Sequence, residues 1–555
     1  MSQIKYPKIP LAQSLIAICK AKGLKHIVIS PGSRNAPLTI GFASNPYFTC
    51  YSIADERCAA FFALGIAQQL DEPVAVVCTS GSAVLNYYPA VAEAFYSQIP
   101  LVVISADRPH DKIDIGDGQT IRQENVFFNH IINSANLTEE VSDKNDEAIQ
   151  YALHLAVSQK GPVHINVPFE EPLYETVNAI TVNTKWIDFE KKENNPFVID
   201  EKFVNQWNSS RKKMVLVGEN KPNTIEKEII DQLAKDTSVI VMTEKTSNLF
   251  HSKFINNIDT VITPFSIDEF EYLQPDILLT FGGMVVSKRI KAFLRQYQPK
   301  EHWHIDELRA YNTYGVLTEH FKIAPTPFFN ALLKDWKFID SDYDAIIQEL
   351  VAIRKTKTEE YLKQIPFSDF KVFDYISKNL PNNIQLQISN SSAIRYLQLV
   401  SIDSSITVFC NRGTSGIDGS TSTAIGAAIT SEKQTFFITG DISFFYDSNA
   451  LWNNYIPKNF KIILINNGGG GIFRILPGHQ ENNVFNTFFE TTHQLNATFL
   501  TQMFNFSYFA VENEKELESQ FVDFLNENDR PSLMEIKTPE KINNQILLDY
   551  FKKLK

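Results

Sequence analysis

Two polar positions in the last third of the chain have residue types that could bind a metal ion. Asp441 follows the apolar run 436–439, and Asn467 follows the apolar run 460–465, which is 26 positions farther on (467 − 441). This interval is typical of a strand–helix–strand unit, which would bring both side chains to one edge of a parallel sheet. A carboxylate, an amide oxygen and backbone carbonyls together suit Mg²⁺, which usually accompanies a diphosphate or triphosphate.

Four glycines at 468–471 follow directly after Asn467. Glycine allows a backbone to approach a ligand closely and to adopt conformations closed to other residues. Taken alone, the Asn-Asn-Gly-Gly stretch is more typical of a strand followed by a flexible turn. The matching Gly-Asp pair upstream favours the metal site. The glycines do not form G-x-G-x-x-G, and no G-x-x-x-x-G-K-[ST] occurs, so neither common nucleotide fingerprint applies.

The elements that would position these residues alternate between short β-rich runs and longer helical stretches. This alternation predicts an α/β fold with parallel sheets flanked by helices. We expect three α/β domains, at 1–185, 197–335 and 365–555, with a polar linker at 188–196 and a charged helical segment at 335–371. The predicted strands are HIVIS, VAVVC, LVVIS and VHINV in the first domain, KMVLVG, SVIVM, DILLTFGG and HWHID in the second, and IQLQIS, ITVFC, QTFFITGD and KIILINN in the third.

Composition narrows the class of protein. The 555 residues are 44% hydrophobic and 21% charged, with a net charge of -12, which argues against a general nucleic-acid binder because phosphate contacts need basic surface. The five cysteines form no CxxC pair and indicate no disulfide framework. Apolar residues at the start recur at helical spacing, and no apolar run reaches the about 18 residues of a membrane helix. We expect a cytoplasmic enzyme without membrane insertion.

The stretch from Gly440-Asp441 to Asn466-Asn467 resembles the signature of thiamine-diphosphate-dependent enzymes, which begins GD and ends NN. It departs from that signature at Ile442, where many such enzymes have glycine. One branch accepts an apolar residue there: the 2-succinyl-5-enolpyruvyl-6-hydroxy-3-cyclohexene-1-carboxylate (SEPHCHC) synthases of menaquinone biosynthesis. The chain resembles this branch also in SPGSRNAPL (30–38), TSGSAVLNYYPAVAEA (79–94), SADRP (105–109), GQTIRQ (118–123), NRGTSGIDG (411–419) and NNGGGGIF (466–473).

The resemblance implies a pyrimidine-binding domain, a central domain and a diphosphate-binding domain, in that order. In this superfamily the cofactor lies between the first domain of one subunit and the last domain of another. The resemblance therefore implies a homo-oligomer, a homodimer or a homotetramer, with an active site shared between subunits.

Glu56 is the catalytic residue that the resemblance implies. Local sequence alone suggests an acidic residue that complements a helix N-terminus. By resemblance, Glu56 hydrogen-bonds the aminopyrimidine of the cofactor and shuttles the proton that lets the amino group deprotonate the thiazolium C2. The neighbouring Phe61 and Phe62 predict an apolar setting, which would raise the proton affinity of the carboxyl group as this role requires.

The implied cofactors are thiamine diphosphate and Mg²⁺, with Mn²⁺ as an alternative metal. The metal would be held by Asp441, Asn467 and the backbone carbonyl of Gly469. Ile417 would be the wedge that bends the cofactor into its V shape. The residues that the resemblance places on the cofactor are Glu56, Ser391, Gly413, Ile417, Gly440, Asp441, Ile442, Ser443, Asn467, Gly469, Ile472 and Phe473.

A set of polar and cationic residues near strand ends and glycine turns matches the substrate-binding residues of the same branch. Taken singly, each is more typical of a solvated or capping residue. Lys288 is the least well aligned of them, because the middle domain offers only the loose motif GGMVVSKRI. The implied substrate-binding residues are Ser33, Arg34, Arg108, Gln119, Lys288, Ser391, Arg395, Arg412, Phe473 and Leu476.

The implied reaction is the decarboxylation of 2-oxoglutarate and the addition of the resulting succinyl-carbanion equivalent to isochorismate, which gives SEPHCHC and CO₂. Two alternatives remain open. Another thiamine-diphosphate carboligase, such as an acetohydroxyacid synthase, is disfavoured by the many arginines, because pyruvate carries only one carboxylate. A noncatalytic nucleotide-binding α/β regulator would keep an anion site and should lack Glu56.

Overall fold

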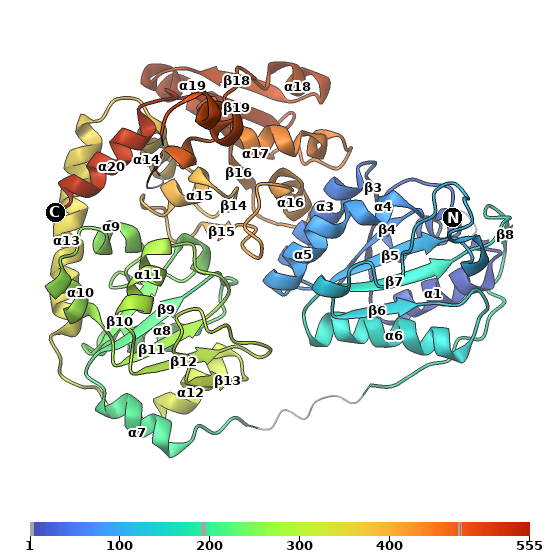
Figure 1. Ribbon diagram of the computed structural model, residues 1–555, viewed down its shortest axis with the longest axis horizontal. Coiled ribbons are helices and arrows are strands. Elements are labelled where there is room, and N and C mark those ends of the chain that lie inside the picture. The colour runs from blue at the N-terminus through green and yellow to red at the C-terminus, as the bar shows by residue number, and fades with distance from the viewer. Residues whose placement is uncertain (1–4, 190–195, 476–477, 479) are drawn as a thin grey trace.

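Three parallel β-sheets, each flanked by helices, make up the molecule (Figure 1). The structure is a computed structural model that describes residues 5–189, 196–475, 478 and 480–555. It confirms the predicted α/β class. Each of the twelve predicted strands coincides with a strand of these sheets, to within a residue or two at either end. Among the described residues, no helix is both long and apolar enough to cross a membrane.

The first sheet has six parallel strands in the order β3-β2-β4-β5-β7-β6. Its central strand β4 is buried along its whole length, as expected for a parallel sheet covered on both faces. The strands are β2 (His26–Ile29), β3 (Thr49–Ser52), β4 (Val74–Cys78), β5 (Leu101–Asp107), β6 (Asn133–Asn136) and β7 (Val163–Pro168); the helices are α1 (Pro10–Ala21), α2 (Ala36–Ala43), α3 (Glu56–Leu70), α4 (Ser82–Asn86), α5 (Tyr88–Ser97) and α6 (Asp143–Ser158). A short antiparallel pair, β1 (Tyr6–Pro7) and β8 (Thr176–Val177), closes this part of the chain.

The last sheet repeats this arrangement, with the order β15-β14-β16-β17-β19-β18. Numbered within its own sheet, each set of strands runs 2-1-3-4-6-5, so the first and last thirds of the chain share one topology. The strands are β14 (Gln385–Ile388), β15 (Thr407–Phe409), β16 (Thr435–Gly440), β17 (Lys461–Asn466), β18 (Ser507–Val511) and β19 (Ser532–Lys537); the helices are α14 (Asp369–Asn379), α15 (Ser392–Leu397), α16 (Ser420–Ala428), α17 (Asp441–Tyr446), α18 (Thr498–Met503), α19 (Glu514–Asn526) and α20 (Asn543–Lys553).

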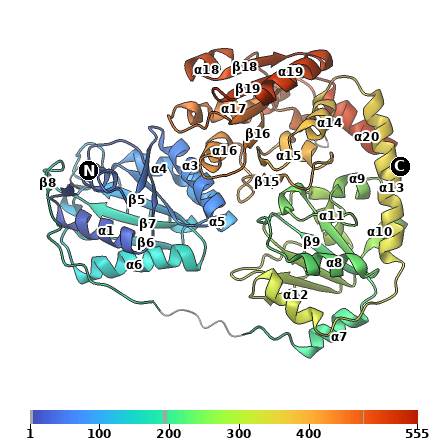
Figure 2. The ribbon, with the colours of Figure 1, turned by 180° about the vertical axis from the view of Figure 1, so that it is seen from behind.

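The middle sheet has five parallel strands in the order β10-β9-β11-β12-β13. Its strands are β9 (Lys213–Val217), β10 (Val239–Thr243), β11 (Ile277–Phe281), β12 (Glu301–Ile305) and β13 (Glu319–Phe321); its helices are α7 (Glu201–Ser209), α8 (Lys227–Lys235), α9 (Ile258–Ile262), α10 (Ile267–Leu273), α11 (Lys288–Gln296) and α12 (Pro325–Leu333). The long helix α13 (Tyr343–Gln364) then leads to the last sheet and lies beside α20 (Figures 1 and 2). The charged segment predicted at 335–371 is thus helical in its middle part.

Helices α3 and α16 join the first and last domains (Figure 2). Two glycines allow them to approach closely: a Cβ on Gly65 would lie 2.1 Å from the backbone oxygen of Thr423, and a Cβ on Gly426 would lie 2.0 Å from that of Phe62. One hydrophobic core continues across this contact, from Phe61 and Phe62 to Ala424 and Ile425. The two outer domains therefore pack as a unit, since their apolar helix faces are buried against each other.

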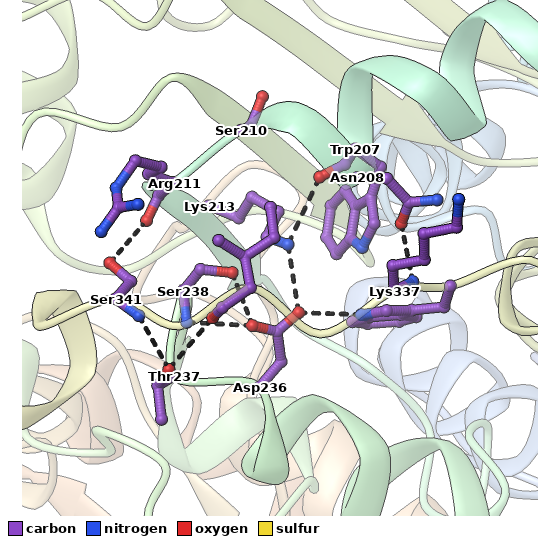
Figure 3. Close-up of polar contacts among 12 residues, drawn as sticks. Trp207, Asn208, Ser210, Arg211, Lys213, Asp236, Thr237, Ser238, Lys337 and Ser341 are labelled. Atoms are coloured by element: carbon purple, nitrogen blue, oxygen red, sulfur yellow. Dashed lines mark hydrogen bonds and ion pairs between the residues drawn. The ribbon is translucent and has the colours of Figure 1, made fainter.

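A buried ion pair holds the middle domain together (Figure 3). The ammonium of Lys213 lies 3.1 Å from a carboxylate oxygen of Asp236, and both side chains are fully buried. The same oxygen accepts a hydrogen bond from the indole of Trp336 at 2.8 Å, and Ser238 donates to the other oxygen. Burial lowers the pKa of Lys213, and the negative charge of Asp236 opposes that effect.

Asp236→Ala is expected to lower the free energy of unfolding of the middle domain by about 3–5 kcal/mol, because it leaves the ammonium of Lys213 buried without a counter-ion. Lys300→Ala is the matched control: Lys300 pairs with Asp276 on the surface and is mostly exposed, so its loss should cost at most about 1 kcal/mol. Urea unfolding followed by tryptophan fluorescence measures both, because Trp207, Trp303 and Trp336 lie in this domain. Equal losses in the two variants would contradict the expectation.

Candidate functional site

Asp441 and Asn467 lie side by side at the carboxyl edge of the last sheet, as the spacing predicts. They follow the neighbouring parallel strands β16 and β17, in which Gly440 pairs with Ile465. The carboxylate of Asp441 is buried and accepts hydrogen bonds from the backbone N–H groups of Gly468 and Gly469, at 2.9 and 3.0 Å, and from Ile442 at 2.7 Å. The glycine loop therefore folds over the carboxylate, and the three predicted metal-binding residues are neighbours.

Asn467 is held in one orientation by Asp369, the first residue of α14. The Nδ2 amide of Asn467 donates to Asp369 at 2.9 Å, which leaves the Oδ1 oxygen as the free acceptor of the amide. Burial raises the pKa of Asp369 to about 6, and hydrogen bonds from Thr538 and Asn467 oppose that rise. An amide oxygen held beside a buried carboxylate and a close-packed glycine backbone is a donor set that fits Mg²⁺. Among the described residues no three His, Cys, Asp or Glu side chains gather into a metal cluster, and this one-carboxylate site is of another kind.

The loop 411–419 lies next to the metal edge and is held from two sides of the same domain. Asn390 donates to the backbone oxygens of Asn411 and Gly416, both at 2.7 Å, and accepts from the guanidinium of Arg412 at 2.6 Å. Ser443 donates to the backbone oxygen of Ile417 at 2.7 Å. The predicted cofactor residues Ile417 and Ser443 are therefore in direct contact.

A cavity of about 220 Å³ lies between the middle and last domains, next to the metal edge. It is lined by four of the predicted residues: Lys288, Arg395, Asn467 and Ile472. Lys288 opens α11, so the structure brings this least well aligned residue to the site. Arg395 stands on α15, one helical turn after Ser391, whose backbone has a positive φ of 69° at the start of that helix. The far wall of the cavity is formed by α20 and includes Phe551.

The cavity has a small excess of cationic groups: its lining includes Lys288, Arg289, Arg395 and Arg474 and the carboxylates Asp259, Asp369 and Glu540. Burial and the nearby charge of Arg412 lower the pKa of Arg395, and the carboxylate of Asp259 opposes this effect. Arg289 adds a further guanidinium, which lies 4.6 Å from the ring centre of Phe551. Within the described residues Arg395 has no ion-pair partner within 4 Å. A local excess of positive charge of this kind suits a carboxylate ligand.

A second group of predicted residues gathers at the carboxyl edge of the first sheet. Arg34 follows β2 and Arg108 follows β5; burial and the charge of Arg108 both lower the pKa of Arg34. Arg34 is buried and donates to the backbone oxygen of Phe169 at 2.9 Å, and Arg108 donates to that of Gly118 at 3.1 Å. Gln119 packs against Gly81, and the exposed Ser33 precedes Arg34.

Glu56 is the first residue of α3, at the same edge of the first sheet. Its side chain is half-buried, and burial together with the negative charge of Asp55 raises its pKa. Cys78 at the end of β4 and the buried Tyr87 are near enough for the charge of Glu56 to raise their pKa values as well. The titratable neighbours of Glu56 are thus Asp55, Cys78 and Tyr87, whereas Phe61 and Phe62 pack in the core between the first and last domains.

The predicted residues thus form two groups within one chain. Over the described residues, no hydrogen bond or ion pair joins Glu56 to Asp441 or Asn467. The residues on either side of Glu56 do contact the last domain: Asp55 accepts a hydrogen bond from Asn449 at 2.8 Å, and Arg57 donates to the backbone oxygen of Tyr446 at 3.0 Å. Phe473 lies in the turn 471–475 and contacts Phe489, with ring centres 6.2 Å apart. Leu476 lies outside the described residues.

Four residues that sequence reasoning did not single out contact the site: Glu93, Asp369, Asn390 and Asp259. Each is a polar residue within an otherwise ordinary helix or loop, and each acts on a partner far away in the chain. Glu93 stands in the quoted motif 79–94, which is the one sequence signal that could have pointed to any of them.

Comparison with known proteins matches the three domains in order. Family models described as thiamine pyrophosphate enzyme N-terminal TPP binding domain, middle domain of thiamine pyrophosphate, and C-terminal TPP binding domain match residues 9–131, 176–388 and 390–536. The chain is 66% identical to a 2-succinyl-5-enolpyruvyl-6-hydroxy-3-cyclohexene-1-carboxylate synthase of Flavobacterium psychrophilum, over 99% of this chain and 100% of the relative. Synthases of the same name from Flavobacterium johnsoniae (62% identical, over 99% and 100%) and Bacteroides fragilis (37%, over 98% of each) also match.

Proposed function

Because this chain belongs to the thiamine-diphosphate-dependent SEPHCHC synthases, we propose that it decarboxylates 2-oxoglutarate and joins the remaining four-carbon unit to isochorismate, releasing CO₂. The observation that supports this choice of substrates is Arg395, which lines the cavity beside the metal edge without an ion-pair partner among the described residues, in a protein whose net charge is -12. Both substrates are dianions at neutral pH, so a productive site needs local positive charge that the overall composition conceals.

We propose that Asp441, Asn467 and the Gly469 carbonyl would hold Mg²⁺, or Mn²⁺ in its place, which would offset the negative charge of the diphosphate of thiamine diphosphate. When bound, thiamine diphosphate supplies the carbon nucleophile and the electron sink for the decarboxylation of a 2-oxoacid. The chain supports this proposal with its donor set: one buried carboxylate, one oriented amide oxygen, and a glycine backbone that folds against them.

Substrate binding is divided between the two groups of residues in this proposal. Arg395, Arg412 and Lys288, with Ser391, would bind the distal carboxylate of 2-oxoglutarate, because guanidinium groups pair with carboxylates in bidentate fashion. Ser33, Arg34, Arg108 and Gln119 would bind isochorismate. Phe473 and Leu476 would add apolar contacts to the substrates.

Glu56 would act across a subunit boundary. Its carboxyl group would hold and return a proton at the aminopyrimidine of a cofactor that is bound by the last domain of another subunit. This arrangement is supported by the resemblance to the superfamily, in which the cofactor lies between two subunits. We therefore propose a homo-oligomer, a homodimer or a homotetramer, in the cytoplasm.

The test of this function is a product assay. The protein is incubated with thiamine diphosphate, Mg²⁺, isochorismate and either 2-oxoglutarate or pyruvate, and the product is identified by mass. We expect SEPHCHC from 2-oxoglutarate, and a kcat/KM for pyruvate about ten- to a hundredfold lower, because pyruvate lacks the second carboxylate and loses a charge-assisted contact of roughly 1.5–3 kcal/mol. Comparable use of pyruvate would favour an acetohydroxyacid synthase, and no turnover with bound cofactor would favour a noncatalytic protein.

Arg395→Ala extends this assay. It should raise the KM for 2-oxoglutarate while leaving the affinity for thiamine diphosphate nearly unchanged, which assigns the loss to the substrate. Arg530→Ala is a suitable control, because Arg530 lies in the same domain and bonds Ser507 and Asn505 at a distance from the cavity.

A further inference from the structure

One buried carboxylate of the first domain is bonded directly to the loop of the last domain that carries the predicted cofactor and substrate residues. Glu93, on α5, is 1% exposed. Its Oε1 oxygen accepts a hydrogen bond from the backbone N–H of Gly413 at 2.7 Å, and its Oε2 oxygen accepts from the backbone N–H and the hydroxyl of Thr414, both at 2.7 Å. Ser97, on the same helix, completes the set with a bond of 2.8 Å to Oε1.

These contacts set the direction of two successive peptide groups. In a trans peptide the N–H and the C=O point to opposite sides, so the carbonyls of Arg412 and Gly413 turn away from Glu93. The carbonyl of Arg412 accepts from Ser415 at 3.2 Å. A flipped peptide between Gly413 and Thr414 would direct a carbonyl at an ionised carboxylate, which can only accept hydrogen bonds. Glu93 therefore excludes the flipped conformation as well as holding the observed one.

The contact between Glu93 and the loop depends on a glycine at position 413. A Cβ on Gly413 would lie 2.6 Å from the backbone oxygen of Glu93, so the loop can approach α5 this closely only because residue 413 is glycine. Asn390 secures the same loop from within the last domain through Asn411 and Gly416, on either side of the Glu93 contact. In the segment between these two points, 412–415, Asn390 bonds the side chain of Arg412, and Glu93 bonds the backbone at Gly413 and Thr414.

We propose that Glu93 is a positioning residue for the reaction: it holds the peptide groups of Gly413 and Thr414 so that the loop 411–419 presents Arg412, Gly413 and Ile417 in the geometry that cofactor and 2-oxoglutarate require. The inference rests on the proposed function of that loop. Glu93 and the loop belong to one chain, whereas Glu56 would act on the cofactor of another subunit. Glu93 therefore connects the first domain of each subunit to the cofactor-binding loop of its own last domain.

The test uses Glu93→Gln in the full-length protein. Glutamine keeps the shape of the side chain but replaces one acceptor oxygen with an NH₂ donor. In the observed loop this NH₂ group would face a backbone N–H group, which it cannot bond. In the loop with a flipped Gly413–Thr414 peptide it could donate to a carbonyl. We expect the affinity for thiamine diphosphate with Mg²⁺, measured by calorimetry, to fall about tenfold, as for the loss of one hydrogen bond to a charged group. The KM for 2-oxoglutarate should rise more than kcat falls, because Arg412 loses its position.

Two further variants separate positioning from simple stability. Ser97→Ala removes a bond to the same carboxylate, keeps the three hydrogen bonds between Glu93 and the loop, and should leave cofactor affinity within twofold. Glu93→Asp keeps a carboxylate that only accepts hydrogen bonds and should recover part of the affinity that Glu93→Gln loses. A lower thermal unfolding midpoint of the cofactor-free protein, with cofactor affinity and KM unchanged, would overturn the proposal.

If Glu93→Gln does not fold, Thr414→Val decides the question. It removes the hydroxyl donor to Oε2 and keeps both backbone bonds, so a two- to fivefold loss of cofactor affinity supports the proposal and an unchanged affinity overturns it. The affinities of the variant and the wild type for thiamine diphosphate are compared by calorimetry, which requires no turnover. A failure of the product assay would therefore count against the proposed substrates and leave the assignment of Glu93 to be judged by itself.

Discussion

Glu56→Gln is expected to reduce turnover by about 10²- to 10⁴-fold while thiamine diphosphate still binds, because positioned acid–base groups typically contribute that much. Glutamine preserves the size and polarity of the side chain and can still bond a ring nitrogen. It cannot release and take back a proton, which is the task that the proposed function assigns to this carboxyl group.

The setting of Glu56 agrees with such a task. Burial and the adjacent Asp55 raise its pKa, so the protonated form is populated closer to neutral pH than for an exposed glutamate. The raised pKa also predicts that the pH dependence of kcat/KM should include a group titrating above the ordinary glutamate value. The titration of this group should be absent from the pH profile of Glu56→Gln.

The measurement is the rate of exchange of the C2 proton of bound thiamine diphosphate, followed by NMR, together with calorimetric affinity. Asp55→Asn serves as the neighbouring control. Asp55 caps α3, bonds Cys58 and Asn449 and helps to raise the pKa of Glu56, so its replacement should lower stability and shift the pH dependence of proton exchange without abolishing exchange. Near-native exchange in Glu56→Gln would show that another group activates the cofactor.

Asp441→Ala is expected to weaken the binding of thiamine diphosphate by more than about a hundredfold. Loss of residues that merely orient metal ligands costs about 10- to 100-fold in affinity, so loss of a direct ligand should cost more. The variant also removes the acceptor for the N–H groups of Gly468 and Gly469, and the glycine loop would lose the group on which it folds.

Calorimetric titration of the cofactor at several Mg²⁺ concentrations separates these effects. If Asp441 binds the metal, the wild-type affinity should rise with Mg²⁺ and the affinity of Asp441→Ala should depend on it little. Asp441→Asn, which keeps an oxygen ligand without the charge, should lie between the two. Asp403→Ala, at an exposed turn of the same domain, should behave as wild type. A cofactor affinity undiminished in Asp441→Ala would exclude the metal site as we assign it.

The amino-acid sequence by itself determined the α/β class, because strands buried on both faces appear as unbroken apolar runs. VAVVC, for example, is β4 from its first residue to its last. It also predicted that Asp441 and Asn467 would meet, since one strand–helix–strand unit returns the chain to the adjacent strand. Ser391 and Arg395 fall one helical turn apart on α15 for the same local reason. Strands β3, β6, β13, β18 and β19 are not among the predicted ones. Four of them lie at sheet edges, where one side needs no burial and the apolar pattern is weak, and Glu535 interrupts the apolar run of the interior strand β19.

Only the tertiary structure decided how the two outer domains meet and what supports the site. Gly65 and Gly426 look like ordinary helical glycines, and their function is visible only when each faces a backbone oxygen of the other helix. Glu93 bonds a residue 320 positions away, and Asp369 orients an amide 98 positions away. Such pairs leave no periodic pattern in the chain, because each partner is selected by its position in space and not by its neighbours in sequence. Local spacing can therefore identify the groups that would touch a cofactor, whereas the residues that hold those groups in place emerge only from the folded chain.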